Sequence, residues 1–167
     1  TAYMDSIPIV AITCNVGVPL LGKDSFQEID IAGVTMPITK YSYIVKDVTK
    51  LAETIRKAFR IAKTGRPGPV LIDIPKDIQT AAGPAEYPSN IQIRGYKPNE
   101  SVHIGQLKKA YKLLRTAKKP LILAGGGINI AHANDKLLAL AEKMQIPVVT
   151  TIMGKGAIPT SHPLYVG

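Results

Sequence analysis

Residues 65–77 (Gly-Arg-Pro-Gly-Pro-Val-Leu-Ile-Asp-Ile-Pro-Lys-Asp) constrain the fold of this chain more than any other stretch. Residues 70–74 form a short, nearly continuous apolar run rich in β-branched side chains, which is typical of a strand covered on both faces. Gly65 suits the left-handed position that follows a helix, and Pro67 and Pro69 prevent that helix from continuing. The stretch therefore predicts a helix end, a tight turn and a buried strand.

Two cations, Arg66 and Lys76, flank this strand and are predicted near its opposite ends. In an open α/β sheet, ligands bind beyond the carboxyl ends of the strands, so Lys76 is the better placed of the two for a ligand. The residues alone leave a second interpretation equally open, in which both are solvated surface cations.

The segments that lead into residue 65 predict a parallel sheet. Strands are predicted at residues 8–13 and 41–45, because both are short and rich in β-branched or aromatic side chains. A helix capped by Asp47 follows, with apolar residues at spacings of three and four between residues 48 and 62. A helix that delivers the chain into a buried strand is half of a βαβ unit.

Residues 121–151 predict a complete βαβ unit. It consists of a strand at 121–124, a turn of three glycines, a helix at 135–143 and a strand at 147–151. The apolar residues predicted to face inward from that helix are Leu137, Leu138, Leu140, Ala141 and Met144. The predicted fold class is therefore α/β with parallel sheets.

The prolines and glycines between residues 80 and 100 interrupt every periodic pattern and predict a linker at residues 81–101. The predicted domains are residues 1–80 and residues 102–167. Beyond the linker, Ser101 is predicted to cap a helix that has Ile104, Leu107, Tyr111 and Leu114 on one face.

Asp24 and Gln27 match a capping box, in which each side chain binds the backbone of the other. The match predicts a helix at about residues 25–32, ended by Gly33. Read in this way, Gln27 has a structural task that needs no ligand.

Composition narrows the classes of function. The net charge of +9 raises a nucleic-acid hypothesis, but the cations are scattered and two Phe with no Trp leave little for base stacking, so no nucleic-acid partner is expected. Cys14 is the only cysteine, which excludes an internal disulfide and fits a reducing cytoplasm. No apolar run approaches the roughly 18 residues that span a membrane. The chain begins without Met and without a leader pattern, and we expect an internal fragment of a longer protein.

Two glycine-bearing loops are the best candidates for a ligand site that the residues alone provide. Gly125, Gly126 and Gly127 follow a predicted strand, but the G-x-G-x-x-G pattern fails at Ile130, and a plain tight turn explains the glycines equally well. Residues 151–154 end the neighbouring strand, so both loops are expected to open onto one crevice. The three histidines are His103, His132 and His162. They show neither the spacing of metal ligands nor an acidic partner, so no metal site is predicted.

Several stretches together resemble the catalytic subunit of acetolactate synthase (acetohydroxyacid synthase), a thiamine-diphosphate enzyme. They are Asp-Ser-Ile-Pro at 5–8, Ala-Ile-Thr at 11–13, Gly-Lys-Asp-Ser-Phe-Gln-Glu at 22–28, Pro-Ile-Thr-Lys at 37–40, the stretch at 65–77, the three glycines at 125–127, and Thr-Ile-Met-Gly at 151–154. Their order and spacing match the family over essentially the whole chain. The part at 65–77 is shared more widely among thiamine-diphosphate decarboxylases and carboligases, whereas Phe-Gln-Glu and Ile-Thr-Lys narrow the match.

The resemblance implies domains and site residues. Residues 1–80 would be the second half of the pyrimidine-binding domain, and residues from 102 would start the central domain, which carries FAD in this family. Gln27 would approach thiamine diphosphate as a catalytic residue, Phe26 would line the pocket, and Lys40 and Lys76 would face the channel of the 2-oxo acids. The residues that would lie along FAD are Arg66, Gly125, Gly126, Thr151, Ile152 and Met153.

The reaction implied by the resemblance decarboxylates pyruvate and joins the two-carbon unit to a second 2-oxo acid, for branched-chain amino-acid synthesis. The family's activating glutamate and its Gly-Asp-Gly motif for diphosphate and Mg²⁺ lie outside this chain, which alone is expected to be inactive. Cys14 and Asn15 replace the usual Gly-Gln after the first strand. The expected parent is a homodimer or homotetramer with a possible regulatory subunit. The alternatives are a carboligase that acts on glyoxylate and a non-catalytic nucleotide-binding module.

Overall fold

A computed structural model describes all residues from 1 to 167 and contains two compact units, residues 1–100 and residues 101–167. Both units are α/β structures built on parallel strands, as the sequence predicted. The longest helices, α2 (Leu51–Lys63) and α4 (Ile104–Thr116), have 13 residues each. No helix combines the length and the apolar character that a membrane span requires.

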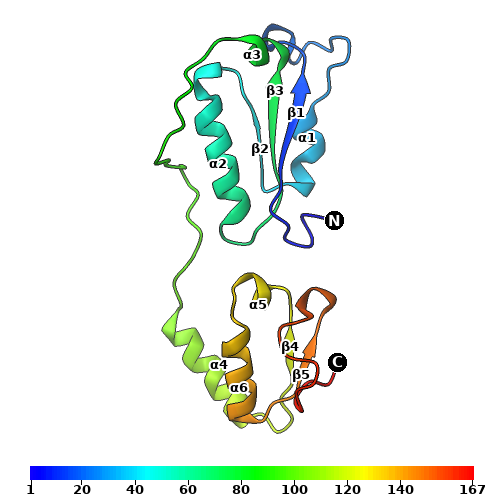
Figure 1. The fold of residues 1–167 in the computed structure, drawn as a ribbon, viewed down its shortest axis with the longest axis vertical. Helices are drawn as coiled ribbons and strands as arrows, with labels where there is room; N and C mark the ends of the chain where they lie inside the picture. Colours follow the sequence, from blue (N-terminus) through cyan, green and yellow to red (C-terminus); the bar gives the residue numbers. More distant parts are fainter. The chain divides into compact units, whose positions relative to one another are not determined.

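The sheet of the first unit has β3 (Val70–Pro75) at its centre, between β1 (Val10–Asn15) and β2 (Tyr41–Ile44), with all three strands parallel (Figure 1). β3 is the strand predicted at residues 70–74, and Val70 and Ile72 are fully buried. The central strand has a neighbour on each side and a helix over each face. A continuous apolar run is therefore what its position requires.

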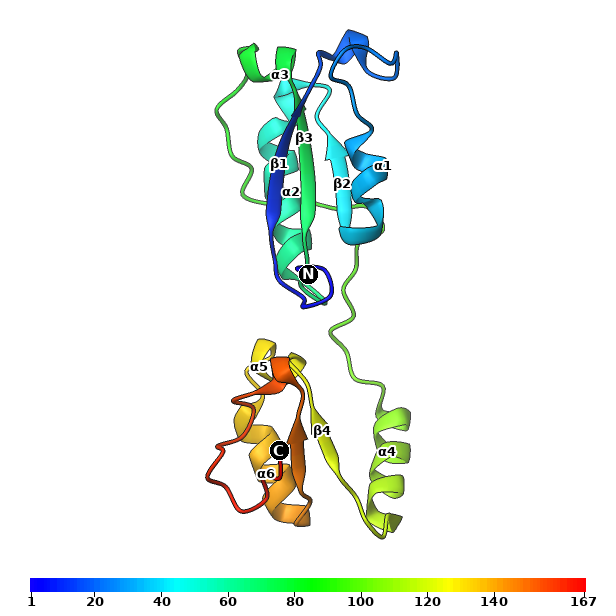
Figure 2. The same ribbon diagram turned by 90° about the vertical axis from the view of Figure 1, so that its right-hand side faces the viewer.

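Helices cover the two faces of this sheet separately (Figures 1 and 2). α2 packs its apolar stripe on the face to which Ile72 belongs. α1 (Ile31–Thr35) lies on the opposite face, where Thr35 Oγ1 is 3.3 Å from Ser42 Oγ. Ser42 pairs with Leu71, the residue before Ile72, and side chains alternate between faces along a strand. The strand register thus sets which helix covers which face.

The backbone before α1 differs from the sequence prediction. No capping box forms and no helix begins at residue 25, because Asp24 and Gln27 both have positive φ, 52° and 64°. α1 is capped instead by Asp30, whose Oδ1 accepts a hydrogen bond from Gly33 N at 2.9 Å. The Asp24–Gln27 spacing fitted a capping box, but the Glu28 carboxylate binds the neighbouring backbone N–H groups.

Residues 81–100 have an irregular backbone, as their composition predicted, yet they pack along α2 and belong to the first unit. Arg56 Nη2 donates to Ser89 O at 2.8 Å, and Arg60 Nη1 donates to Ile91 O at 3.0 Å. The Ile91 side chain is buried. Two arginines one helical turn apart on α2 therefore hold a segment that forms no regular secondary structure.

Tyr96 fastens the end of this segment to the C-terminus of α2. Its hydroxyl lies 2.9 Å from Thr64 Oγ1 and donates to Thr64 O at 2.9 Å. Tyr96→Phe keeps the ring but loses every contact of the hydroxyl, so we expect the free energy of unfolding to fall by about 1 kcal/mol. Protease cleavage within residues 81–100 should accelerate, whereas Tyr87→Phe, whose ring is exposed, should cleave like the wild type. Wild-type cleavage of Tyr96→Phe would contradict this account.

The second unit pairs β4 (Ile122–Ala124) with β5 (Val148–Thr150) in parallel, and α6 (Asn134–Met144) connects them (Figure 1). This is the βαβ unit that the sequence predicted. A short helix, α5 (Gly127–Ile130), stands between the glycine turn and α6. The buried apolar residues of this unit are Ala124, Leu137, Ala141, Ile146, Val148, Ala157 and Ile158.

The cap and the packing of α4 differ from the prediction. His103, and not Ser101, is the capping residue, since His103 Nδ1 accepts a hydrogen bond from Gln106 N at 3.2 Å. No residue of α4 is buried within this unit. Of the residues predicted to share one face of this helix, Ile104, Leu107 and Tyr111 are exposed. In α6, Leu140 was predicted to face inward but is exposed.

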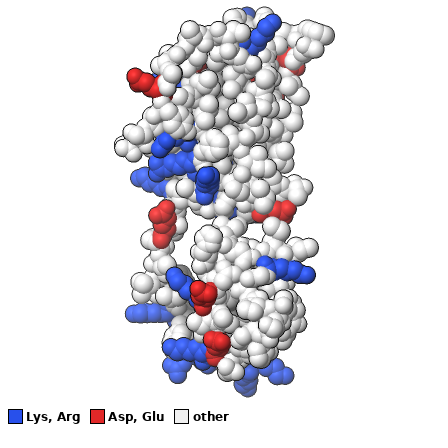
Figure 3. Space-filling view, viewed as in Figure 1, with Lys and Arg blue, Asp and Glu red and all other residues white.

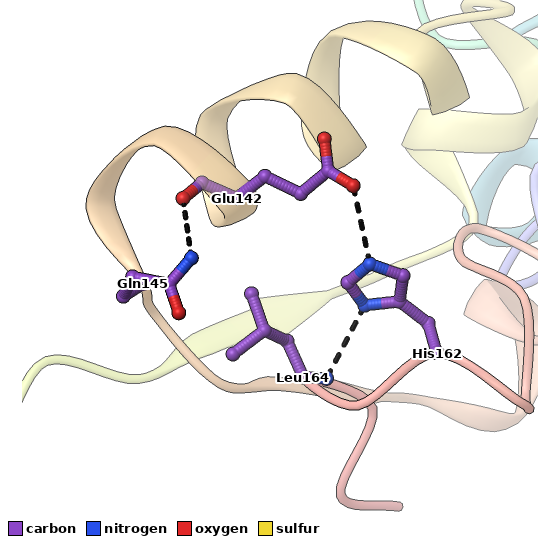
Figure 4. A network of polar contacts seen from close by, with 4 residues as sticks. All are labelled: Glu142, Gln145, His162 and Leu164. Carbon is purple, nitrogen blue, oxygen red and sulfur yellow. Dashed lines mark hydrogen bonds and ion pairs between the residues drawn. The ribbon is translucent and has the colours of Figure 1, made fainter.

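His162 has an acidic partner, contrary to the sequence prediction. Its Nε2 lies 3.3 Å from Glu142 Oε1, and its Nδ1 accepts a hydrogen bond from Leu164 N at 3.2 Å (Figure 4). Gln145 Nε2 donates to Glu142 O at 2.7 Å beside them. Because Nδ1 accepts, the neutral imidazole donates through Nε2 to the carboxylate. The pair fixes the last residues of the chain to the end of α6.

Candidate functional site

The loop at residues 16–30 leaves the carboxyl end of β1 and carries two predicted site residues, Phe26 and Gln27. Phe26 is 86% exposed, although large apolar side chains are usually buried. Gln27 is exposed as well and has a φ of 64°, a left-handed backbone conformation that residues other than glycine seldom adopt. The structure thus presents both side chains at the edge of the sheet where α/β proteins bind ligands.

Glu28 holds this loop in its turn conformation. Its Oε2 accepts hydrogen bonds from Ser25 N and Ser25 Oγ, both at 2.9 Å, and its Oε1 accepts from Gly22 N. The Ser25 and Gly22 amides lower the pKa of Glu28 below its ordinary value of 4.5, because they bind the charged carboxylate. The Glu28 carboxylate therefore does the work that the predicted capping box was expected to do.

The lowered pKa of Glu28 predicts how the loop responds to acid. A carboxyl whose pKa is lowered in the folded state stabilises it above its ordinary pKa, and this contribution is lost as the pH falls through the lowered value. Amide exchange at Gly22 and Ser25, corrected for intrinsic rates, should therefore accelerate as the pH falls below 4.5. In Glu28→Gln this pH dependence should vanish, and its persistence would contradict the assignment.

The carboxyl end of β3 meets the start of the same loop. Lys76 begins α3 (Lys76–Thr80) immediately after the strand and is exposed. Asp77, the next residue, accepts a hydrogen bond from Val18 N at 3.1 Å. Lys76 therefore lies at the same edge as Phe26 and Gln27, as the rule for open sheets predicted.

Lys40 and Arg66 lie at the opposite end of the sheet. Lys40 precedes β2, and its backbone N donates to Pro69 O at 2.7 Å, just before β3. Six residues of β3 separate this end from Lys76, roughly 20 Å along the strand. Lys40 and Lys76 were expected to face one substrate channel, but within this unit they cannot contact the same carboxylate.

The contacts of Lys40 are those of a helix cap. Its Nζ donates to Thr64 O at 2.8 Å and to Ile61 O, and lies 5.7 Å from the centre of the Tyr96 ring. The last carbonyl groups of a helix lack partners in the helix itself and attract cations. Lys40 thus occupies a stabilising position at the end of α2.

Arg66 reaches back to the start of the chain. Its Nε donates to Ser6 Oγ at 2.8 Å, and its Nη2 donates to Met4 O at 2.8 Å. The guanidinium still has exposed surface, so these contacts orient a group that can also bind an anion.

In the second unit, Gly125 and Gly126 follow β4, and Thr151, Ile152 and Met153 follow β5. A Cβ built on Gly126 would lie 3.0 Å from the Met153 Cβ, and one on Gly125 would lie 3.9 Å from Thr151 Oγ1. The two loops are therefore adjacent at the carboxyl edge of the β4–β5 pair, as the sequence predicted.

The details of this edge modify the expectation of a phosphate-binding turn. The glycines lead into α5, which has only four residues, and α6 begins further on. Asn129 of α5 instead joins the loops, since its Nδ2 donates to Met153 O at 3.3 Å and to Lys155 O at 3.1 Å. Gly125 has no side chain and lies beside Thr151, so its backbone permits close approach by a ligand.

Sequence reasoning missed Asp73, which is 0% exposed in β3. Its Oδ1 accepts from Thr13 Oγ1 at 2.8 Å, and its Oδ2 accepts from Asn15 Nδ2 at 2.9 Å. The available signal was an acidic residue inside an apolar strand, which requires hydrogen-bond donors on a neighbouring element. Thr13 and Asn15 lie two residues apart and so share one face of β1.

Neither the surface charge nor a group of metal-ligating residues adds a ligand site to the carboxyl edges of the two sheets. On the face shown in Figure 3, cationic side chains form separate groups, the largest over the C-terminal half of α2, with acidic side chains between them. No three His, Cys, Asp or Glu side chains come close enough together to hold a metal ion.

Comparison with known proteins shows which proteins the two units are similar to. Residues 107–167 match the family described as "Thiamine pyrophosphate enzyme, central domain", which places the second unit among the thiamine pyrophosphate enzymes. Over the whole chain, the sequence is 50% identical to the probable acetolactate synthase large subunit of Methanocaldococcus jannaschii. It is 48% identical to the acetolactate synthase large subunit of Corynebacterium glutamicum over 99% of this chain, and 44% identical to that of Haemophilus influenzae over 100%. Along its whole length the chain is therefore similar to acetolactate synthase large subunits.

The chain is shorter than these relatives. It spans 29% of the Methanocaldococcus protein, 26% of the Corynebacterium protein and 30% of the Haemophilus protein. The similarity nevertheless covers both units, including the loop at residues 16–30 and the two glycine-bearing loops.

Proposed function

We propose that this chain is a segment of an acetolactate synthase, an enzyme that decarboxylates pyruvate and joins the two-carbon unit to a second 2-oxo acid in branched-chain amino-acid synthesis. The observation that carries the proposal is the identity of 44% to 50% along the whole chain with large subunits of that name. The first unit would be the second half of the pyrimidine-binding domain. The second unit would begin the central domain.

The residues of the first unit would act at the carboxyl edge of its sheet. Gln27 would hydrogen bond to thiamine diphosphate and to the substrate beside it, and Phe26 would shield that site from water. Lys76, exposed at the same edge, would attract the carboxylate of a 2-oxo acid. The placement of Lys40 on the end of α2 favours a supporting role for that cation over direct substrate contact.

Three bound groups belong to the proposal. When bound, thiamine diphosphate supplies the electron sink for decarboxylation. The exposed Phe26 and the outward-held Gln27 fit one side of such a cofactor, and the ligands for Mg²⁺ would come from outside this chain. FAD fits the second unit, where Gly125 leaves bare backbone beside Thr151 and where Ile152 is 84% exposed. Arg66 is also proposed to contact FAD.

Substrate preference tests the proposal against its nearest rival. The full-length protein should form acetolactate from pyruvate and acetohydroxybutyrate when 2-oxobutyrate is added, in each case only with thiamine diphosphate and Mg²⁺. A preference for glyoxylate would favour the related carboligase. Binding of FAD or ADP without any thiamine dependence would favour a nucleotide-binding module.

The chain of 167 residues should be inactive by itself. Acetolactate formation by the purified chain with thiamine diphosphate and Mg²⁺ would contradict this expectation. The proposal also includes a cytoplasmic location, which the single unpaired Cys14 fits, and a homodimer or homotetramer with or without a regulatory subunit.

A further inference from the structure

The loop at residues 16–30 is attached near its start to α3, the helix that follows β3, and near its end to the last residue of β1. At the start of the loop, Asp77 Oδ1 and Oδ2 both lie 3.1 Å from Val18 N, which donates to the carboxylate. At the end of the loop, Asn15 Nδ2 donates to Ile29 O at 3.3 Å. The chain between these two attachments carries Phe26 and Gln27.

Asp73 determines how Asn15 is oriented. The buried Asp73 carboxylate accepts one hydrogen from Asn15 Nδ2 at 2.9 Å, which leaves the second hydrogen of that amide for Ile29 O. Asn15 Oδ1 accepts from Val16 N at 2.9 Å, so every polar atom of the Asn15 side chain has a partner. A flipped amide would place its oxygen against the carboxylate, and this arrangement is therefore disfavoured.

We propose that Asp73, through Asn15, and Asp77 are positioning residues that hold Phe26 and Gln27 at the carboxyl edge of the sheet. The proposal rests on the function proposed above for that edge. Neither aspartate is a catalytic residue in this account. Asp73 is 0% exposed and cannot touch a substrate, and the Asp77 carboxylate is occupied by Val18 N and Ile78 N. Displacement of a reacting group by about 1 Å can lower a rate about a hundredfold, so small shifts of this loop are sufficient.

An exchange of the side chains of Asn15 and Asp73 separates an effect on the position of the loop from an effect on the stability of the protein. In the double variant Asn15→Asp with Asp73→Asn, the amide now on β3 can donate to the carboxylate now on β1, and its oxygen can still accept from Thr13, so the sheet keeps its internal contacts. The carboxylate on β1 has no hydrogen to give Ile29 O, so only the attachment of the loop is lost. The full-length protein should then keep its unfolding midpoint, while amide exchange in residues 22–30 becomes about fivefold faster. The kcat for acetolactate should fall about tenfold or more.

A second pair of variants tests the other attachment. Asp77→Ala should lower kcat about tenfold, with a smaller change in KM for pyruvate. Asp77→Asn keeps an acceptor for Val18 N and should restore most of the lost activity.

Thr13→Val is the matched control for the exchange of Asn15 and Asp73, because it removes a hydrogen bond of Asp73 at 2.8 Å without touching the loop. Its loop exchange and kcat should remain those of the wild type.

Unchanged loop exchange in both the Asn15/Asp73 double variant and Asp77→Ala would overturn the proposal. So would activity losses that simply follow lowered unfolding midpoints, with Asp77→Asn no better than Asp77→Ala. Amide exchange does not depend on catalysis. If the wild-type protein formed no acetolactate but the variants loosened residues 22–30, the proposed function would fail while the two attachments would stand.

Discussion

Gly154→Ala should destabilise the second unit by about 3 kcal/mol, at the upper end of the usual cost of overpacking. A Cβ on this buried residue would lie 2.1 Å from Ala124 O and 2.9 Å from Ala124 C. Ala124 is buried in β4, and its carbonyl already accepts a hydrogen bond from Thr151 N at 3.0 Å. Neither partner can move without opening the edge where Thr151, Ile152 and Met153 lie. Amide exchange across β4 and β5 should therefore accelerate strongly, and FAD retention by the full-length protein should fall.

Gly127→Ala is the matched control for this substitution. A Cβ on Gly127 would meet nothing within 4 Å, and the residue opens α5, where alanine favours helix more than glycine by about 1 kcal/mol. This variant should be as stable as the wild type or slightly more stable. If Gly154→Ala unfolded at the same urea concentration as Gly127→Ala, the close packing of the two loops would be refuted.

Lys40→Met should lower the stability of the first unit by about 2–3 kcal/mol, since hydrogen bonds to a charged group contribute more than neutral ones. The ammonium group binds Ile61 O and Thr64 O at the end of α2 and lies near Tyr96. Removing it leaves two helix carbonyls without this partner and loosens the segment at residues 81–100. Urea unfolding followed by amide exchange of α2 measures both effects.

Lys76→Met provides the comparison, because Lys76 is exposed at the other end of β3. Surface substitutions of this kind change stability by less than about 0.5 kcal/mol. In the full-length protein, Lys76→Met should raise KM for pyruvate while leaving the unfolding midpoint unchanged. The opposite pattern, with Lys76→Met unstable and Lys40→Met changed only in KM, would reverse the roles assigned to the two lysines.

The elements that the sequence predicted well are those fixed by local chemistry. β3 was found within one residue because an apolar run lies between Pro69 and the exit at Pro75. Asp47 was predicted to cap the helix and caps the 3-10 turn at Val48–Lys50 that leads into α2, with its carboxylate accepting from Thr49 N at 2.9 Å. In both cases the residues that define the element are neighbours in the chain.

The features that were missed depend on strand order. Lys40 reaches the end of α2 only because β2 lies beside β3, and nothing near Lys40 in the sequence specifies that pairing. Asp73 likewise finds Asn15 across the β1–β3 pair, a contact between residues 58 positions apart. The helix at α4 was predicted from its period, but burial of an apolar face also needs a neighbouring surface, and no residue of α4 is buried in this unit.

We propose that the edge carrying Phe26 and Gln27 belongs to the active site of an acetolactate synthase. The most direct test measures acetolactate formation from pyruvate by the full-length protein and by its Gln27→Ala variant, with and without thiamine diphosphate. We expect thiamine-dependent product in the wild type and a rate at least about a hundredfold lower in the variant, with an unchanged unfolding midpoint. Thiamine-independent product, or a variant as active as the wild type, would contradict the claim.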